Sequence, residues 1–433
     1  MSFLGLTLFI PSLFSYGQLK SLGDVLSKDG NLESFTIARY QAVHWPALIL
    51  GFSLLICATY MLVRRKVVET ILTTWLIWLS RMIVRLKQDT RLFWNDLLTH
   101  IPHGWELGAL LAICAAALAG RLFFIDQPID YDEAYTFTEF AQHSFRQIVT
   151  DYHVPNNHIF QTILVRISFL IFGAAPWALR IPVLLAGMAL IPAVYLLAKR
   201  LYGTVTALIA ASLTAATPIL VYYSVTARRY MLVALFNVLT LILSLYLIHH
   251  KNLFAWLAWI IITVLGFYTL PIMFYPFGIM ITWMLILGST GDLSMQYQKM
   301  RGLLKYLLVA SICAGVLTII CYSPILLKNG ILNFFNGATV VNSLSLGAFI
   351  SSFPTKLGET LDNWRFRTPR AVETILIAGL FLSPFIHPGS TKPRTSLQSA
   401  ALLFLSLILL AERAKSMPRI WLWLLPLCLI FSA

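Results

Sequence analysis

Apolar segments of about 16 to 22 residues, with few or no charges, recur along this chain, and an α-helix of that length crosses a bilayer. Hydrophobic residues make up 58% of the 433 positions and charged residues only 12%. A soluble domain carries about 25% charged residues, and its helices keep polar faces. These segments are apolar all round. The sequence therefore predicts an all-α, polytopic transmembrane helix bundle.

The hydrophobic pattern predicts about eleven membrane spans, with the last two being the least well defined. The expected spans are residues 45–63, 104–125, 177–198, 203–223, 230–248, 253–268, 271–288, 303–322, 371–387, 396–411 and 418–433.

Basic residues predict which ends of these spans face the cytoplasm. The net charge is +14, but the cations gather in short clusters at span ends, as in the positive-inside pattern, so membrane topology explains them better than nucleic acid. Three basic residues near the C-terminus, Arg413, Lys415 and Arg419, fall on the opposite side and count against this topology. The clusters expected inside are Arg64 to Lys66, Lys199-Arg200, His249 to Lys251, Lys299 to Lys305 and Lys392 to Arg394.

Residues 68–85 allow two interpretations. Apolar side chains such as Ile71, Trp75 and Leu79 share one helical face, and the basic residues Arg81 and Arg85 follow, which favours a helix lying in the membrane interface. If the segment spans instead, the orientation of everything downstream is inverted.

An acidic cluster, Asp130-Tyr131-Asp132-Glu133, follows the apolar run 107–125, in which Arg121 is the only charge. The whole chain has only 18 acidic residues, and like charges crowded at a bilayer surface repel each other unless they bind something. We therefore expect a catalytic base or a metal-binding pair of carboxylates. The alternative is helix capping, with Asp132 as the N-cap and Glu133 in the first turn.

The cluster opens a predicted outer loop, residues 126–177, that contains two short helices. Apolar residues from Phe137 to Val149 share one face, which indicates an amphipathic helix on the membrane surface. The run from Ile159 to Phe172 is too short to span and predicts an interfacial or re-entrant helix. Together these helices are expected to present Asp132 and residues 151–158 to one cavity.

Three motifs in this region resemble those of the GT-C membrane glycosyltransferases, in the branch of the protein O-mannosyltransferases and aminoarabinose (lipid A) transferases. The resemblance covers about residues 104–290. It suggests a GT-C-like catalytic core at 104–322, preceded by a segment (1–103) with one span and an interfacial helix, and followed by a second outer loop and C-terminal spans (323–433). The motifs are Asp132-Glu133-Ala134-Tyr135-Thr136, Asp151-Tyr152-His153-Val154-Pro155-Asn156-Asn157-His158 and Ser224-Val225-Thr226-Ala227-Arg228-Arg229-Tyr230.

The resemblance implies that a sugar moves, with inversion, from a polyprenyl-phosphate donor to a lipid, glycan or protein acceptor on the non-cytoplasmic face. The implied location is the bacterial inner membrane, with the site on the periplasmic or extracellular side and membrane lipids around it. Asp132 matches the family's first acidic position and is the expected general base. Glu133 would orient the acceptor or support a metal, and Tyr135 would contact substrate. Asp130 is an additional carboxylate without an assigned role.

For the donor phosphate, the same resemblance points to Arg228, with Arg229 and Tyr230 in support, because a guanidinium fork matches phosphate oxygens. The alternative is that both arginines only reach for the membrane interface. Arg365, Arg367 and Arg370 in the second loop are further candidates, but lipid headgroup contacts explain them better.

The polar stretch 151–158 offers candidate substrate and metal ligands. His153 and His158, together with Glu133, are weak candidates for a divalent metal, which would stabilise a leaving phosphate. Ordinary hydrogen bonding is the commoner role for such histidines. Asn156 and Asn157 are expected either to contact the sugar or to cap the following helix. Asp151 is counted with the substrate-binding residues, and no cofactor is certain.

A different class of function, a transporter or flippase of a lipid-linked saccharide, is the main alternative. Such a protein is expected to carry charges in the middle of its spans, along a translocation path. This chain places nearly all its charges at span ends. The pattern therefore favours the transferase.

Overall fold

The computed structural model describes residues 2–27, 35–154, 156–289, 300–330, 344–386, 397–413 and 418–433. Within these ranges every regular element is helical, which confirms the predicted all-α class. The chain divides into two compact units, Met1–Leu86 and Lys87–Ala433, and each is described by itself. Several predicted features lie outside the described residues: Lys299, Lys392 to Arg394, Lys415 and Pro155.

The first unit contains α1 (Ser2–Ser12), α2 (Tyr16–Leu26) and α3 (Ile37–Val63). The predicted span 45–63 lies within α3. Helices α1 and α2, which the sequence did not predict, are bent by 106° relative to each other. Helix α1 packs closely on α3, and a Cβ at Gly51 would lie only 2.7 Å from the backbone nitrogen of Phe9. This close approach requires a glycine.

Helix α4 (Arg65–Thr99) is a single 35-residue helix that contains the predicted interfacial segment 68–85. Its length and composition are also sufficient for a membrane span. The choice between a surface helix and a span therefore remains a prediction.

The second unit is the helical bundle. Counted over the described residues of both units, six helices, α3 and α4 among them, are long and apolar enough to cross a membrane. The number rises to as many as eight if each bent pair of helices is one span, and there are five shorter apolar helices. The count of eleven spans thus stays a prediction. Each expected span in this unit nevertheless coincides with a helix or a pair of helices: α5 (Trp105–Phe124), α9 (Pro176–Tyr202), α10 (Thr204–Ala216) with α11 (Pro218–Ser224), α12 (Tyr230–His249), α13 (Leu253–Thr269), η2 (Pro271–Met273) with α14 (Phe274–Ser289), α15 (Met300–Asn329), α18 (Arg370–Ile386), α19 (Leu397–Glu412), and η5 (Pro418–Leu424) with α20 (Leu425–Ser432).

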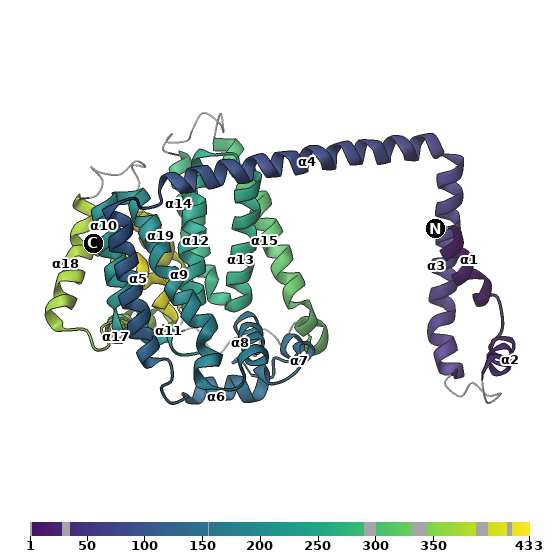
Figure 1. The fold of residues 1–433 in the computed structure, drawn as a ribbon, viewed down its shortest axis with the longest axis horizontal. Helices are drawn as coiled ribbons and strands as arrows, with labels where there is room; N and C mark the ends of the chain where they lie inside the picture. Colours follow the sequence, from purple (N-terminus) through teal and green to yellow (C-terminus); the bar gives the residue numbers. More distant parts are fainter. Residues whose placement is uncertain are drawn as a thin grey trace. The chain divides into compact units, whose positions relative to one another are not determined.

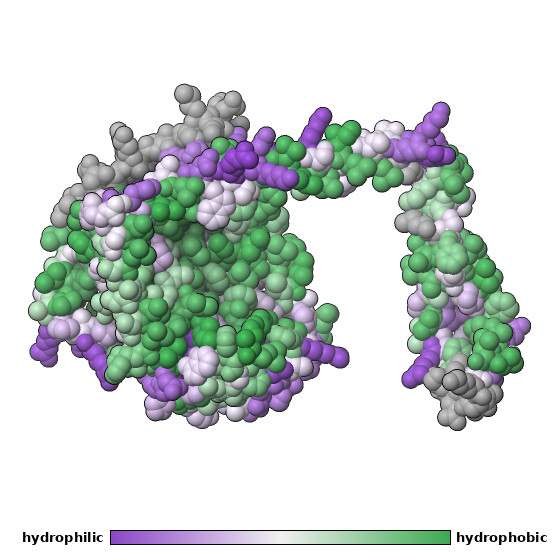
Figure 2. All heavy atoms as spheres, viewed as in Figure 1, coloured by the Kyte–Doolittle hydropathy of each residue, from purple (hydrophilic) through white to green (hydrophobic). Residues whose placement is uncertain are grey.

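Helix α12 lies at the centre of this bundle, and almost all of its residues are buried. Apolar side chains cover the middle of the bundle, whereas hydrophilic side chains gather at its two ends (Figure 2). That distribution suits a protein surrounded by lipid tails, since charged groups are costly in the bilayer core.

The break between α10 and α11 has a local cause. Proline cannot donate the next helical hydrogen bond and forces the preceding residue out of the helical region. Thr217 is accordingly extended (φ −62°, ψ 117°), and the two helices meet at 62°. The bend directs α11 towards the loop that carries Arg228 and Arg229.

The predicted outer loop lies at one end of the bundle, together with α11 and α17 (Leu346–Trp364) (Figure 1). It forms α6 (Tyr131–Thr136), a π-helix η1 (Phe137–Ala141), α7 (Phe145–Thr150) and α8 (Ile159–Phe172). The expected single amphipathic helix is therefore divided into short pieces. Phe140 and Ile148 are buried within the protein, whereas Phe145 is 44% exposed.

Both predicted helix caps in this loop are wrong. The N-cap of α6 is Asp130, not Asp132, because the Glu133 carboxylate accepts the Asp130 backbone N–H at 3.0 Å and so begins the helix two residues earlier. The N-cap of α8 is His158 rather than an asparagine. The side chain of Asn157 instead donates hydrogen bonds to backbone carbonyls on the preceding segment.

Candidate active site

The three neighbouring carboxylates have three different partners. Asp130 accepts a hydrogen bond from the Tyr222 hydroxyl at 2.5 Å. Glu133 forms an ion pair with Arg180, and Asp132 forms one with Arg228. The three carboxylates are neighbours in the sequence, but each has a different environment in the structure.

Glu133 belongs to the protein interior. Its side chain is 3% exposed and that of Arg180 is 1% exposed, and two nitrogens of Arg180 donate to the two carboxylate oxygens at 3.0 and 2.7 Å. The backbone N–H of Ala227 also donates to Glu133. Such a buried pair is tolerated because its remaining hydrogen-bonding groups are satisfied. Glu133 thus connects the acidic loop to α9 and to the loop after α11.

Arg180 completes this connection and was not predicted. Its guanidinium donates to the carbonyls of Ile125 at 2.8 Å, Gln127 at 2.6 Å and Pro128 at 3.1 Å, as well as to Glu133. The signal in the sequence was an arginine inside an apolar run, which needs an internal partner.

Asp132 is more accessible than Glu133, with 31% of its side chain exposed. Its Oδ2 atom contacts Arg228, and Arg419 Nη1 lies 3.5 Å from the same oxygen. The Thr136 hydroxyl donates to the Asp132 carbonyl at 2.8 Å, which orders this turn.

Arg228 and Arg229 occupy the loop between α11 and α12, and both lie over the ring of Tyr230, at 5.9 and 4.7 Å from its centre. Arg229 also contacts His158 Nε2. Burial lowers the pKa of Arg229 to about 10, against an opposing effect of Tyr230, so this buried guanidinium is still charged at pH 7. Buried cations without enough anionic partners favour an anionic ligand.

Arg419, in η5, brings a third cation to the same place. In the predicted topology this residue falls on the side opposite to the other basic clusters. A cation that violates the positive-inside pattern was in fact the available signal for a residue at the site.

Residues 151–158 do not all lie at one site: Asp151 and His153 pair with each other, whereas Asn156 and His158 line the cavity described below. Asp151 pairs with its neighbour His153, whose Nδ1 is 2.7 Å away. Asn157 is almost fully buried and holds the segment together, donating to the carbonyls of Ile148 at 2.8 Å and Asp151 at 2.6 Å. His158 is buried, and its burial, with Arg229 and Arg419 nearby, holds its pKa well below the usual value. It is therefore neutral at pH 7.

A small cavity joins these groups. Gln161, which was not predicted, is fully buried there, and neither its amide nitrogen nor its oxygen finds a hydrogen-bond partner among the described residues. Buried polar atoms are normally satisfied, so this amide suits a polar ligand. The cavity is lined by Asp132, Thr136, Asn156, His158, Gln161, Ala227, Arg228 and Arg229.

The other predicted residues lie in different surroundings. The half-buried ring of Tyr135 contacts the rings of Tyr131 and Phe140, at 6.2 and 6.5 Å between centres. Arg365 pairs with Asp362 and, at 3.5 Å, with Glu373. Arg367 lies over the Phe366 ring, and Arg370 begins α18.

The proposed metal ligands are not gathered into one site. Among the residues that the structure describes, no group of three or more His, Cys, Asp or Glu side chains is arranged to hold a metal ion. Glu133 and His158 contact Arg180 and Arg229, respectively. A divalent metal therefore stays an untested prediction.

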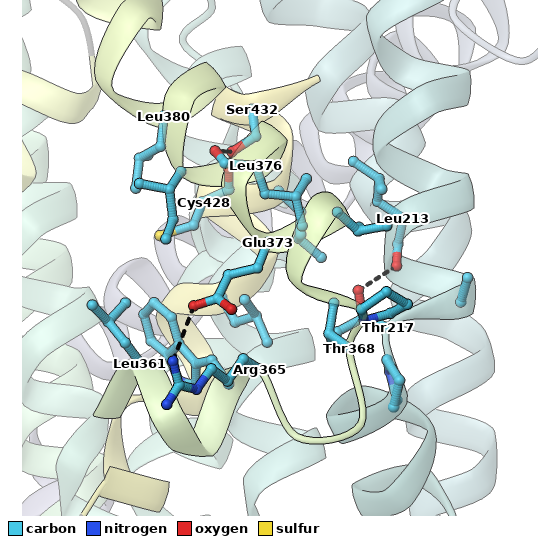
Figure 3. A pocket seen from close by; sticks show the side chains of 18 residues that line it. Leu213, Thr217, Leu361, Arg365, Thr368, Glu373, Leu376, Leu380, Cys428 and Ser432 are labelled. Atoms are coloured by element: carbon cyan, nitrogen blue, oxygen red, sulfur yellow. Dashed lines mark hydrogen bonds and ion pairs between the residues drawn. The ribbon is translucent and has the colours of Figure 1, made fainter. Parts of the chain in front are cut away.

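An apolar cavity of about 290 Å³, here called cavity A, lies between the α10–α11 bend, the end of α17, α18 and α20 (Figure 3). Apolar side chains, six of them leucines, line most of it, and the Arg365–Glu373 ion pair also lines it. Phe366 links it to the acidic cluster, since its ring is 6.0 Å from that of Tyr222, the partner of Asp130.

A second apolar cavity of about 380 Å³, cavity B, lies on the other side of α17, against α19 and η5. It shares Trp364 with cavity A and includes Trp421, two residues after Arg419. Each apolar cavity therefore has a residue at or beside its lining that lies close to the charged cluster: Phe366 for cavity A and Trp421 for cavity B.

Comparison with known proteins agrees with this architecture. Residues 159–325, from α8 into α15, match the sequence model of the dolichyl-phosphate-mannose-protein mannosyltransferase family. The structure is similar to that of ArnT from Cupriavidus metallidurans bound to undecaprenyl phosphate, with a TM-score of 0.55, 16% identity and 75% of this chain covered. The chain has a GT-C fold. The fold that the resemblance implied is therefore confirmed, and this GT-C-fold protein is an integral multi-pass membrane protein.

The limits of the match are also informative. The GT-C chain covers 59% of the length of that ArnT structure. The apo ArnT structure from the same organism gives 14% identity, 76% coverage of both chains and a TM-score of 0.43. A search of curated proteins gives no match. The family match includes Arg228 and Arg229 but begins after Asp132, so the assignment of the acidic cluster depends on the geometry.

Proposed function

We propose that this GT-C protein is an inverting membrane glycosyltransferase that moves a sugar from a polyprenyl-phosphate donor to an acceptor hydroxyl on the non-cytoplasmic face. The main support is one arrangement: a partly exposed carboxylate, Asp132, contacts Arg228, and both side chains line a small polar cavity. A proton acceptor and a phosphate-binding cation are the two groups that such a displacement needs.

In the proposed reaction, Asp132 takes the proton of the acceptor hydroxyl as that oxygen attacks the anomeric carbon. The bond between this carbon and the phosphate oxygen breaks, and its electron pair leaves with polyprenyl phosphate. Arg228 and Arg229 stabilise the charge that develops on the phosphate. Because the attacking oxygen enters opposite the leaving group, a single displacement inverts the anomeric centre.

Two further residues prepare this site. Glu133 is a positioning residue, because its ion pair with Arg180 and its contact with the Ala227 N–H hold the acidic turn against the Arg228 loop. The buried Gln161 amide has hydrogen-bonding capacity to offer a sugar. Sugar hydroxyls both donate and accept, as an amide does.

The polyprenyl tail of the donor is assigned to cavity A. Its leucine-rich lining suits an isoprenoid chain, and Phe366 and Tyr222 lead from it to the acidic cluster. The ArnT structure that resembles this protein contains undecaprenyl phosphate, a ligand of the same chemical class.

The test compares Asp132→Asn with the wild type in cells, by mass analysis of cell-envelope glycans with and without the protein. We expect transfer to fall by about 10²–10⁴-fold, the contribution of a general base, with normal membrane insertion. Glu69→Gln is the matched control, since Glu69 pairs with Arg65 on an exposed part of α4. Retained transfer in Asp132→Asn would remove the proposed base.

The predicted orientation has its own test. In a variant whose five native cysteines are replaced by serine, a cysteine at Gln142 should react with an impermeant thiol reagent added to intact cells. A cysteine at Lys251 should not react. The opposite labelling pattern would place the site in the cytoplasm.

A further inference from the structure

Two arginines from distant parts of the chain meet at one oxygen of Asp132. Arg228 comes from the loop before α12, and Arg419 comes from η5 near the C-terminus. Arg228 contacts Oδ2 directly, and Arg419 Nη1 is 3.5 Å from the same atom. The proposed base is therefore held by Arg228, which lines the small polar cavity, and by Arg419, which approaches the same oxygen.

The neighbouring carboxylates are occupied elsewhere. Asp130 receives the Tyr222 hydroxyl, and Glu133 is paired with Arg180. Within the described residues, Asp132 is the carboxylate that both Arg228 and Arg419 contact. With Arg229 also present, the cavity carries more cationic than anionic side chains, so it can accept a further anion.

The contacts of Asp132 with Arg228 and Arg419 are partly exposed, which leaves room for these side chains to rearrange. The side chains of Asp132 and Arg419 are 31% and 34% exposed, and that of Arg228 is 12% exposed. The Glu133–Arg180 pair, in contrast, is almost completely buried. Arg229 is held between His158 and the Tyr230 ring. Rearrangement is therefore expected at Arg228 and Arg419.

We propose that Arg228 and Arg419 hold the Asp132 carboxylate in the place of the donor phosphate, and that the arriving phosphate displaces it. This inference rests on the proposed function. A phosphate presents more acceptor oxygens than a carboxylate and suits the guanidinium fork. Once the arginines turn to the phosphate, Oδ2 is released to accept the acceptor's proton. Donor binding thus creates the active base, and Arg419 becomes a phosphate-binding residue.

This exchange predicts an unusual effect on binding. In Asp132→Asn the arginines have no carboxylate to release, so purified full-length protein in detergent should bind undecaprenyl phosphate about three- to tenfold more tightly than the wild type. Asp130→Asn is the matched control, because it removes the same charge from a carboxylate that faces Tyr222. Its affinity should stay close to that of the wild type.

Arg419→Gln tests the second arginine. Alone it should weaken binding of undecaprenyl phosphate about threefold or more, and the gain from Asp132→Asn should shrink in its background, since coupled residues are not additive. An equal gain in affinity for undecaprenyl phosphate in Asp132→Asn and Asp130→Asn would indicate a general charge effect. That result would overturn the proposed exchange of carboxylate for phosphate but not the proposed function. Wild-type protein that binds no undecaprenyl phosphate would overturn the proposed donor class as well. Size-exclusion profiles verify that each variant is folded.

Discussion

The two sides of the acidic turn show how neighbouring carboxylates acquire different roles. Glu133 is enclosed with Arg180 and connects three segments, whereas Asp132, one residue earlier, is partly exposed and contacts Arg228 and Arg419. A buried ion pair is costly to break, but a partly exposed one contributes little to stability. The comparison teaches that two neighbouring carboxylates at one turn can have very different surroundings, and the proposed reaction uses the more accessible of the two.

The largest expected effect is on the structural side. Glu133→Gln should leave Arg180 as an uncompensated buried charge and reduce the free energy of unfolding by about 3 kcal/mol or more. Thermal unfolding in detergent measures the change. Asp132→Asn, the matched variant, should change stability by about 1 kcal/mol or less. Equal destabilisation by the two variants would remove the distinction between them.

On the reactive side, Arg228→Lys should lower kcat/KM about ten- to a hundredfold while stability stays nearly constant. Lysine keeps the charge but loses the guanidinium fork that matches phosphate, and each tenfold loss is about 1.4 kcal/mol of transition-state stabilisation. Arg65→Lys is the matched control, because Arg65 pairs with Glu69 on an exposed part of α4, and it should leave transfer unchanged. Unaltered transfer in Arg228→Lys would argue against phosphate binding by this residue.

A matched pair of substitutions can show which of the two apolar cavities holds the donor tail. Leu376→Trp fills cavity A and should raise the KM for the donor about tenfold, because the isoprenoid tail loses its place. Leu405→Trp fills cavity B and should have a smaller effect. If only Leu405→Trp raises the KM, the tail belongs in cavity B.

The smallest effect is the pH dependence of stability that His158 contributes. Its burial, with Arg229 and Arg419 nearby, depresses its pKa in the folded state, so the unfolded chain binds the proton more readily. Stability should therefore fall as the pH drops below about 6.5, by about 1 kcal/mol per pH unit. Unfolding of the wild type and of His158→Gln at pH 7 and pH 5 measures this. A wild type and variant with the same slope would contradict the expected burial.

Much of the helical framework followed from local sequence. The limits of α5, α8, α9 and α12 agree with the predicted segments to within a few residues. These limits depend on hydrophobic length and on breakers such as Pro218, which act within a few positions. The failures were also local: the Glu133 side chain moved the α6 cap to Asp130, and a π-helix divided the expected amphipathic helix.

For the site, the residue types were predicted but their partners were not. Arg180, Gln161 and Arg419 entered only through the structure, since each lies far along the chain from the residues that it serves or was buried within an apolar run. The Asp130–Tyr222 contact alone spans 92 positions. No periodicity or motif spacing encodes such a pairing.

By itself, the sequence determined that this protein is a helical membrane bundle with acidic and basic motifs at one end, because hydrophobicity and charge act on each segment separately. Only the tertiary structure decided which carboxylate is enclosed and which is accessible. That choice depends on side-chain contacts of the acidic turn with α9, α11 and η5, which let Arg180 neutralise Glu133 in the interior and leave the partly exposed Asp132 in contact with Arg228 and Arg419.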